Sequence, residues 1–161
     1  MKEKYILDVC CGSRAWWKQK KNPNTIYMDI RKEPKGFIKG KKYKNVEVNP
    51  DIIGDYTNIP FSSKSFSLVV FDPPHLIKNT SGIISKRYGY LGDNWELQIS
   101  KGFDECMRVL KDKGILIMKW ADTNISPRKI LPLLSEEMLI GTHTKKGVNN
   151  TFFWTFMKVE K

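Results

Sequence analysis

The sequence predicts an α/β fold, with a doubly wound and mostly parallel sheet of about seven strands and an antiparallel hairpin at one edge. Three observations lead to this expectation. Short apolar runs alternate with segments of helical pattern, which is typical of parallel strands with helices on both faces. The last two apolar runs follow each other without a helix between them. Three runs end in an aspartate, which would gather carboxylates at the sheet edge where ligands bind.

The first two strands are expected at 4–9 (KYILDV) and 25–30 (TIYMDI), because both runs are short and apolar. Between them, Ser13 follows Gly12 and suits the N-cap of a helix that begins at Arg14. An Asn-Pro-Asn turn then ends this segment before the second strand. The pattern therefore predicts a strand–helix–strand unit.

Residues 31–44 form a basic stretch with seven Lys or Arg residues and one Glu. Pro34, Gly36 and Gly40 disfavour a long helix there, and a third short strand is expected at 46–48. The whole chain has a formal net charge of +11, and such an excess favours a polyanionic partner, most often nucleic acid. We interpret the stretch as a surface for nucleic acid, with a solvated basic face as the alternative.

The second half of the chain continues the alternation. A strand is expected at 66–71 (FSLVVF), followed by a glycine-containing loop at 76–92 that is either a substrate lid or a connector. A helix is expected from Asn94 to about Leu110, because its apolar residues recur every three or four positions.

The last predicted elements close the sheet. A buried strand at 115–120 (ILIMKW) precedes a helix that begins near Pro127 and ends near Met138. Residues 139–143 and 150–159 are expected to form the final hairpin.

The composition indicates one globular domain, 1–161, since 40% of the residues are hydrophobic and 28% are charged. No apolar run resembles a signal peptide or approaches the roughly 18 residues of a membrane helix, so we expect a cytoplasmic protein without a membrane partner. The three cysteines form no CxxC pair, and His75 and His143 are the only histidines. We therefore expect reduced cysteines and no metal site.

Three aspartates, Asp8, Asp29 and Asp72, each end an expected strand, so a parallel sheet would bring them to one edge. Gly12 makes a tight turn after the first strand, and Asp29 follows Asp8 by 21 residues, a spacing that suits hydrogen bonds to ribose hydroxyls. A turn with one glycine disfavours a pyrophosphate. The pattern therefore indicates a ligand with a ribose and no phosphate.

Two further motifs flank the strand at 66–71. Asp55 and Tyr56 precede it and suit an adenine ring, because a carboxylate accepts from the amino group while a backbone amide meets a ring nitrogen. The strand ends in DPPH, residues 72–75, which is stiffer and more polar than a turn requires. Trp16 is expected in the core, with the lining of the ligand pocket as the alternative.

The order of these motifs resembles that of class I S-adenosylmethionine-dependent methyltransferases over nearly the whole chain. DPPH is similar to the [DNS]PP[YFW] motif of the amino-methyltransferases that act on adenine N6 or cytosine N4, with a histidine at the fourth position. Small phage and prophage proteins of this kind carry similar CCGSR and DPPHL segments. The resemblance implies a Rossmann-like sheet, S-adenosyl-L-methionine as the methyl donor, and no metal.

The resemblance also assigns roles to residues. It places the donor's amino-acid part near Asp8, Cys10, Gly12 and Ser13, its ribose at Asp29 and Ile30, and its adenine at Asp55 and Tyr56. It places the target amine at Asp72, Pro73, Pro74 and His75. Asp72 and the Pro73 carbonyl would each accept one N–H of the amine, which turns its lone pair toward the methyl group. His75 would stack on the flipped base or, alternatively, transfer a proton.

The function favoured by the sequence is methyl transfer to an exocyclic amine of a nucleobase, with adenine N6 in DNA ahead of cytosine N4. An RNA or small-molecule methyltransferase on the same fold is the alternative, and a non-catalytic binding protein is a reading of another class. A chain of 161 residues leaves no separate target-recognition domain. Target recognition would fall to the loop at 77–92, to a homodimer or a partner subunit, or would be lax.

Overall fold

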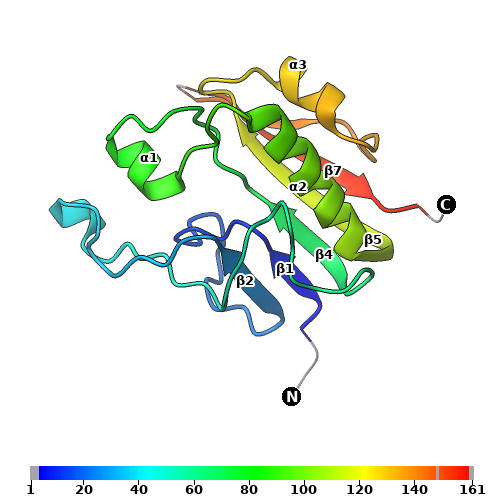
Figure 1. Cartoon of the computed structure of the whole chain (residues 1–161), viewed down its shortest axis with the longest axis horizontal. Helices are drawn as coiled ribbons and strands as arrows, with labels where there is room; N and C mark the ends of the chain where they lie inside the picture. The colour runs from blue at the N-terminus through cyan, green and yellow to red at the C-terminus, as the bar shows by residue number, and fades with distance from the viewer. Residues whose placement is uncertain (1–3, 148, 160–161) are drawn as a thin grey trace.

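The computed structural model describes residues 4–147 and 149–159, which form a seven-stranded sheet of order β3-β2-β1-β4-β5-β7-β6 (Figure 1). The strands are β1 (Ile6–Asp8), β2 (Thr25–Asp29), β3 (Ile52–Ile53), β4 (Phe66–Phe71), β5 (Leu110–Ala121), β6 (His143–Lys145) and β7 (Thr151–Met157). β1 to β5 pair in parallel, whereas β7 runs antiparallel to both β5 and β6. The expected α/β class, the number of strands and the antiparallel hairpin at one edge are confirmed.

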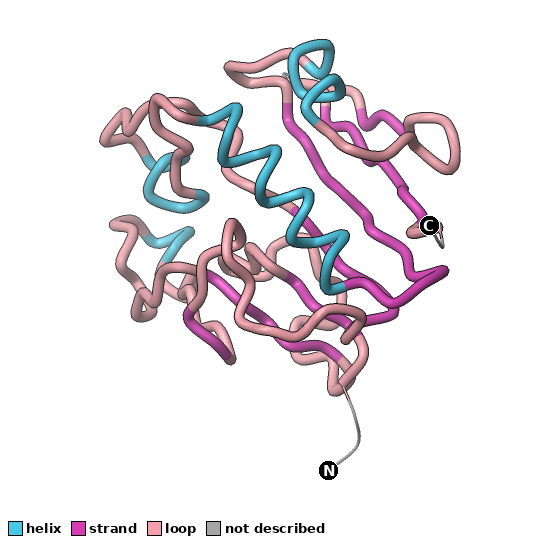
Figure 2. Tube along the Cα trace, turned by 45° about the vertical axis from the view of Figure 1, so that its right-hand side comes forward, coloured by secondary structure: helices cyan, strands magenta, loops and turns pink. Residues whose placement is uncertain are grey.

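Helices cover one face of the sheet (Figures 1 and 2). They are α2 (Trp95–Val109), α3 (Pro127–Ile130) and the short 3-10 helix η2 (Leu131–Leu133). α2 buries Ile99, Phe103 and Cys106 in one apolar core with Trp120 and Trp154 of the sheet. Burying each large apolar side chain is worth about 1.5–3 kcal/mol, so this stripe holds the helix on the sheet.

The segment between β1 and β2, residues 9–24, is irregular, and the prediction of a helix from Arg14 is wrong. Arg14 has a φ of 53°, which is outside the helical range. Its guanidinium lies 3.7 Å from the centroid of the Tyr27 ring and donates to the carbonyls of Lys20 and Asn49. These contacts with distant parts of the chain override the local helical preference. In the described residues, no α-helix joins the first three strands.

Two boundaries differ in the loops beside the sheet. At 46–48 only Val48 pairs, in an isolated bridge with Glu33, and the third strand lies later in the chain. The stretch at 76–92, expected as a loop, contains α1 (Ile83–Tyr88). α1 and the 3-10 helix η1 (Lys41–Tyr43) lie together at one end of the molecule (Figures 1 and 2).

Two further boundaries differ near the C-terminal strands. The helix expected to run from Pro127 to Met138 stops being α-helical after Ile130, because Pro132 has no N–H and its ring clashes with the preceding turn. In place of the strand expected at 139–143, the structure has β6 at His143–Lys145, so the two ranges share only His143.

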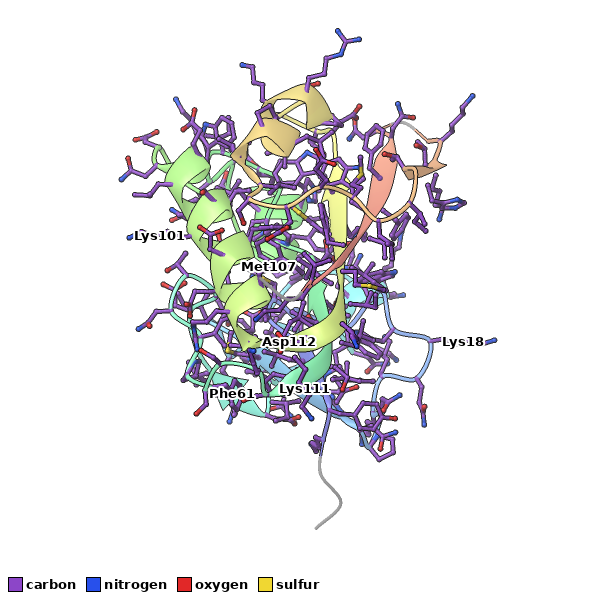
Figure 3. All side chains as sticks on the ribbon, turned by 90° about the vertical axis from the view of Figure 1, so that its right-hand side faces the viewer. Lys18, Phe61, Lys101, Met107, Lys111 and Asp112 are labelled. Atoms are coloured by element: carbon purple, nitrogen blue, oxygen red, sulfur yellow. The ribbon has the colours of Figure 1, made fainter. Side chains whose placement is uncertain are left out.

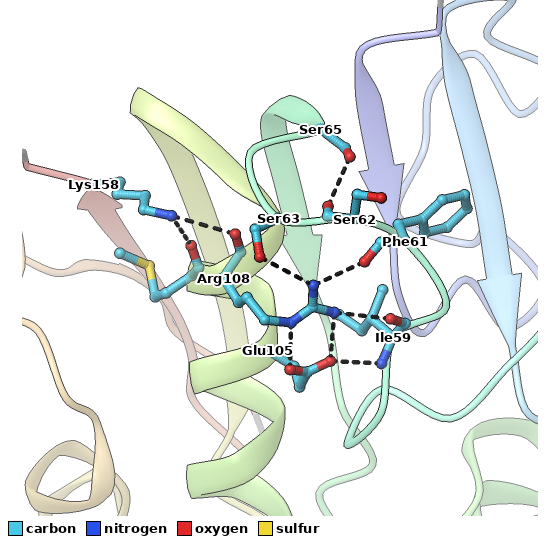
Figure 4. A network of polar contacts seen from close by, with 9 residues as sticks. Ile59, Phe61, Ser62, Ser63, Ser65, Glu105, Arg108 and Lys158 are labelled. Atoms are coloured by element: carbon cyan, nitrogen blue, oxygen red, sulfur yellow. Dashed lines mark hydrogen bonds and ion pairs between the residues drawn. The ribbon is translucent and has the colours of Figure 1, made fainter.

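Polar contacts tie the loop before β4 to the end of α2 (Figure 4). The Arg108 guanidinium donates to the carbonyls of Ile59 and Phe61 at 2.9 and 2.8 Å. It also pairs with Glu105, whose carboxylate accepts from the Ile59 N–H at 2.8 Å. Lys158 Nζ donates to carbonyls at the end of α2, which lack partners within the helix. Loop and helix are therefore held as one unit.

Lysine side chains project from both sides of the molecule (Figure 3). Lys101 projects from the outer side of α2, and Lys18 projects on the opposite side of the molecule.

Among the residues that the structure describes, no helix has the length and apolar character needed to cross a bilayer.

Candidate active site

A pocket of about 700 Å³ lies at the carboxyl ends of β1, β2 and β4. The order of the sheet reverses between β1 and β4, and open α/β sheets bind ligands at such a point. Of the residues predicted for the site, those that line the pocket are Cys10, Gly12, Ser13, Asp29, Ile30, Asp55, Tyr56, Asp72, Pro73, Pro74 and His75. The fold therefore gathers the predicted residues in one cavity, with Asp8 as the exception.

Asp29 ends β2, and backbone N–H groups from two segments hold its carboxylate at the pocket floor. Its Oδ2 accepts from the Gly12 N–H at 2.8 Å, and its Oδ1 accepts from the Arg31 N–H at 2.9 Å. The Arg31 guanidinium adds an ion pair at 3.3 Å. Gly12 has a φ of 48°, and a Cβ placed there would meet no atom within 4 Å, so the glycine leaves open space. The arrangement holds one carboxylate rigidly beside an open turn.

Asp8 ends β1 but does not line the pocket. Its carboxylate accepts from Trp17 Nε1 at 2.6 Å and from the Cys10 N–H at 3.2 Å, and it is 3% exposed. Burial raises the pKa of Asp8 to about 7. The hydrogen bonds from Trp17 and Cys10 act in the opposite direction and offset only part of this effect. Asp8 therefore anchors the irregular segment under the pocket, and its contact with a donor remains a prediction.

Asp55 and Tyr56 come from the loop between β3 and β4. Asp55 is exposed, and one of its oxygens accepts from the N–H and hydroxyl of Thr57 at 2.8 and 2.9 Å. The Tyr56 ring lies against Phe71, with centroids 5.4 Å apart. A Cβ on Gly102 would lie 2.5 Å from this ring, so α2 needs a glycine at that position. The close approach of the helix fixes the tyrosine at the pocket wall.

Asp72 follows β4 and faces a cation that the sequence reading missed. Lys119 of β5 places its Nζ 2.8 Å from both oxygens of Asp72. Burial raises the pKa of Asp72, while the charge and the hydrogen bonds of Lys119 act in the opposite direction. The signal in the sequence was a single lysine within the apolar run ILIMKW. A charged residue is rarely placed in a buried strand without a partner.

His75 lies at the pocket wall beside Tyr88 of α1, with ring centroids 5.8 Å apart and an interplanar angle of 46°. Burial lowers the pKa of His75 to about 4, and the nearby charge of Lys119 acts in the same direction. The imidazole is therefore neutral at physiological pH. This favours an aromatic surface over a proton carrier at that pH.

α1 and the residues after it form one rim of the pocket, through Tyr88, Gly89 and Tyr90. Arg31 links this rim to the floor, because its guanidinium donates to the Lys86 carbonyl at 3.1 Å while it pairs with Asp29. The segment predicted as a lid or connector is therefore linked through Arg31 to the carboxylate predicted for the ribose.

The opposite rim comes from residues that the sequence reading did not assign to the site, apart from Trp16. Trp16, Lys145, Thr151 and Phe153 all line the pocket. Cys10 also lines it, and burial raises the pKa of its thiol well above the ordinary value, so it is not a thiolate nucleophile.

The basic stretch 31–44 leaves the floor of the pocket and carries exposed lysines around η1. Figure 1 shows η1 at the same end of the molecule as α1. In the ranges 4–147 and 149–159, no three His, Cys, Asp or Glu residues are grouped so that they could hold a metal ion.

The sequence matches no family model and no curated protein. Several solved structures share its fold. The N-methyltransferase NodS from Bradyrhizobium japonicum WM9 is 13% identical, with a TM-score of 0.61, and the match covers 98% of this chain and 86% of that one. The Mtq2-Trm112 complex of E. cuniculi, which methylates the translation termination factor eRF1, is 14% identical, with a TM-score of 0.59 over 99% and 87%.

A third match is a 16S rRNA (adenine(1408)-N(1))-methyltransferase from Catenulisporales acidiphilia, 10% identical, with a TM-score of 0.55 over 98% and 86%. NodS has been solved with S-adenosyl-L-homocysteine, and the rRNA enzyme with its cosubstrate SAM. These neighbours act on different classes of substrate. The chain described here has the class I fold of S-adenosylmethionine-dependent methyltransferases.

Proposed function

We propose that the protein transfers a methyl group from S-adenosylmethionine to an exocyclic amine of a nucleobase, with adenine N6 in DNA favoured over cytosine N4. The observation that carries the proposal is the position of Asp72-Pro73-Pro74-His75 in the same pocket as Asp29 and Gly12. An amine-binding motif and a ribose-binding carboxylate then face one cavity. Methyl transfer between two bound molecules needs that proximity.

The donor side of the pocket suits S-adenosylmethionine. Asp29 accepts from two backbone N–H groups and from Arg31 Nε, which leaves about one of the roughly four acceptor positions of a carboxylate for a ribose hydroxyl. Asp55 has one oxygen that is not used by Thr57, and Tyr56 offers a ring face next to it. When bound, the donor supplies an electrophilic methyl carbon on a sulfonium. The open space at Gly12 leaves room for its amino-acid part.

On the acceptor side, Asp72 and the Pro73 carbonyl receive the two N–H groups of the target amine. The amine nitrogen is a weak nucleophile because its lone pair is delocalised into the ring, and these acceptors turn it toward tetrahedral geometry. Asp72 then takes the proton that transfer releases. The charge and hydrogen bonds of Lys119 oppose the rise in the pKa of Asp72 that burial causes, and neutral His75 stacks on the base.

The exposed lysines of 31–44 provide a surface for a phosphate backbone next to the pocket. The proposal includes a second copy of the chain or a partner subunit as the source of target recognition. The likeness to an rRNA adenine methyltransferase and to a protein-modifying complex gives the alternatives, an RNA or another amine-containing substrate on the same fold. A phage or prophage origin rests on the sequence resemblance.

The test is transfer of tritium from labelled donor to duplex DNA, single-stranded DNA and RNA, followed by identification of the methylated nucleoside. Asp72→Ala should lower the rate of transfer by roughly a hundredfold or more while leaving donor affinity unchanged, since its interactions form with the nucleophile. Asp93→Ala removes an exposed carboxylate outside the pocket and is the matched control. Full activity of Asp72→Ala would refute the mechanism. No donor binding at millimolar concentration would refute the enzyme proposal.

A further inference from the structure

A row of side chains crosses the sheet from its outer edge to Asp72. His143 of β6 pairs with Phe153 of β7, and Phe153 pairs with Lys119 of β5. Residues that pair across neighbouring strands point to the same face, so these side chains lie next to one another. Lys119 then contacts Asp72 at 2.8 Å. The row therefore joins the exposed edge strand to the acceptor side of the pocket.

The outer part of this row is aromatic. Trp16 lies over Phe153, with ring centroids 5.6 Å apart and planes inclined by 38°. His143 flanks Phe153 from the other strand at 6.0 Å and 44°. Trp16 and Phe153 line the pocket and are only partly buried, and His143 is exposed. The three rings form a continuous aromatic surface, which we call the aromatic track.

Lysines accompany the aromatic track in the pocket or in the sequence. Lys145 lines the pocket next to it. Lys146 and Lys18 are exposed, and they follow His143 and Trp16 by three and two residues in the sequence. In the described part of the chain, none of these three lysines forms an ion pair with an acidic side chain. Their charges are therefore available to a ligand. Aromatic rings interleaved with free cations are the arrangement by which proteins bind single strands of nucleic acid.

We propose that the aromatic track binds a single-stranded nucleic acid, with the bases next to the reacting one stacked on Trp16, Phe153 and His143, and the phosphates near Lys145. Stacking on a protein ring needs an open base face, and in a duplex the neighbouring pairs cover both faces. The proposal rests on the proposed function for the base that enters at Asp72, and adds the strandedness of the substrate and the surface that holds it.

The test measures binding separately from catalysis. Fluorescence anisotropy compares dye-labelled single-stranded DNA, single-stranded RNA of the same sequence and duplex DNA, with the full chain at several salt concentrations. Single strands should bind at least roughly tenfold more tightly than duplex. His143→Ala and Phe153→Leu should each weaken single-strand binding by roughly tenfold, the loss expected for one stacked base. Tyr5→Ala, an exposed tyrosine outside the pocket, is the matched control and should have no effect.

The contribution of positive charge to binding is tested with a second pair of variants. Lys145→Glu should weaken single-strand binding and lower the salt slope by about one, as the loss of a phosphate contact predicts. Lys101→Glu makes the same change on the outer side of α2 and should do neither (Figure 3). Circular dichroism shows whether each variant remains folded.

The outcomes separate this inference from the proposed function. Single-strand binding that depends on the track, without any donor binding, would support the track and refute the methyltransferase. Donor binding with equal affinity for duplex and single strands, or track variants that bind like the native chain, would refute the track and leave the methyltransferase standing. Donor binding without binding of any nucleic acid would point to a small-molecule or protein substrate and would also refute the track. If the track variants weaken the binding of single-stranded DNA and single-stranded RNA equally, this would support recognition of the bases and phosphates that both have in common.

Discussion

The two sides of the pocket hold their carboxylates by different means. On the donor side, Asp29 accepts from two backbone N–H groups in addition to its ion pair with Arg31, and its side chain is 5% exposed. On the acceptor side, Asp72 is bonded by the side chain of Lys119 and is 23% exposed. Backbone donors cannot leave without unfolding part of the chain, whereas a lysine has four rotatable bonds and can move away.

The difference separates binding from chemistry. A carboxylate fixed by the backbone is already placed for a ligand, so it loses little freedom when the ligand binds. A carboxylate held by a lysine can exchange this partner for the target amine. Changes on the donor side should therefore affect folding and donor affinity, and changes on the acceptor side should affect the rate of transfer.

The largest expected effect on stability is at Asp8, under the donor side. Its pKa rises from 3.8 to about 7 on folding, so the folded state binds the proton more tightly than the unfolded state. Stability should therefore fall as pH rises from about 4 to about 7, by an amount on the order of 4 kcal/mol at about 1.36 kcal/mol per unit. Asp8→Asn should flatten this dependence, as measured by urea unfolding at several pH values. An unchanged pH dependence would contradict the assignment.

The next effect is at Asp29. Asp29→Ala should weaken donor binding by roughly tenfold or more, and should also lower the free energy of unfolding by about 1–3 kcal/mol because the Gly12 and Arg31 N–H groups lose their acceptor. Calorimetry and urea unfolding measure the two effects. Asp29→Asn keeps an oxygen acceptor and should be the milder change. Native donor affinity in Asp29→Ala would remove this residue from the donor site.

A smaller effect is expected at Lys119, on the acceptor side. Lys119→Met removes the charge that opposes burial, so the pKa of Asp72 should rise further and the pH profile of transfer should move toward alkaline pH. Donor affinity should stay unchanged. Lys119→Arg keeps the charge and is the control. Carboxyl carbon NMR of Asp72 follows the same shift without any transfer, and an unmoved titration would show that Lys119 does not set its charge.

The smallest effect is expected at His75. Because its pKa is about 4, the rate should not titrate near pH 6.5, and His75→Phe should keep or raise activity by preserving a stacking surface. His75→Ala is the control that removes the ring. A rate that depends on an ionisation near pH 6.5 and loses this dependence in His75→Phe would overturn the stacking role.

Much of this architecture is predictable from the sequence, because short apolar runs that end in an aspartate specify strands and the edge where they finish. What remains hidden depends on contacts between distant residues. Asp8 ends a strand as Asp29 does, yet its side chain bonds to Trp17 outside the pocket. The partnership of Lys119 with Asp72 follows from the register of β4 and β5. The irregular course after Arg14 depends on Tyr27, which no local pattern reveals.

The bonds between Arg108, Glu105 and the loop at Ile59 and Phe61 have a consequence for the order of assembly. They join a segment that precedes β4 to a helix that follows it, so they close a loop of the chain that includes β4, α1 and α2. A chain emerging from the ribosome presents Tyr56 long before Arg108 exists. The wall of the pocket at Tyr56 can therefore be secured only after the last turn of α2 has been synthesised and has docked on the sheet.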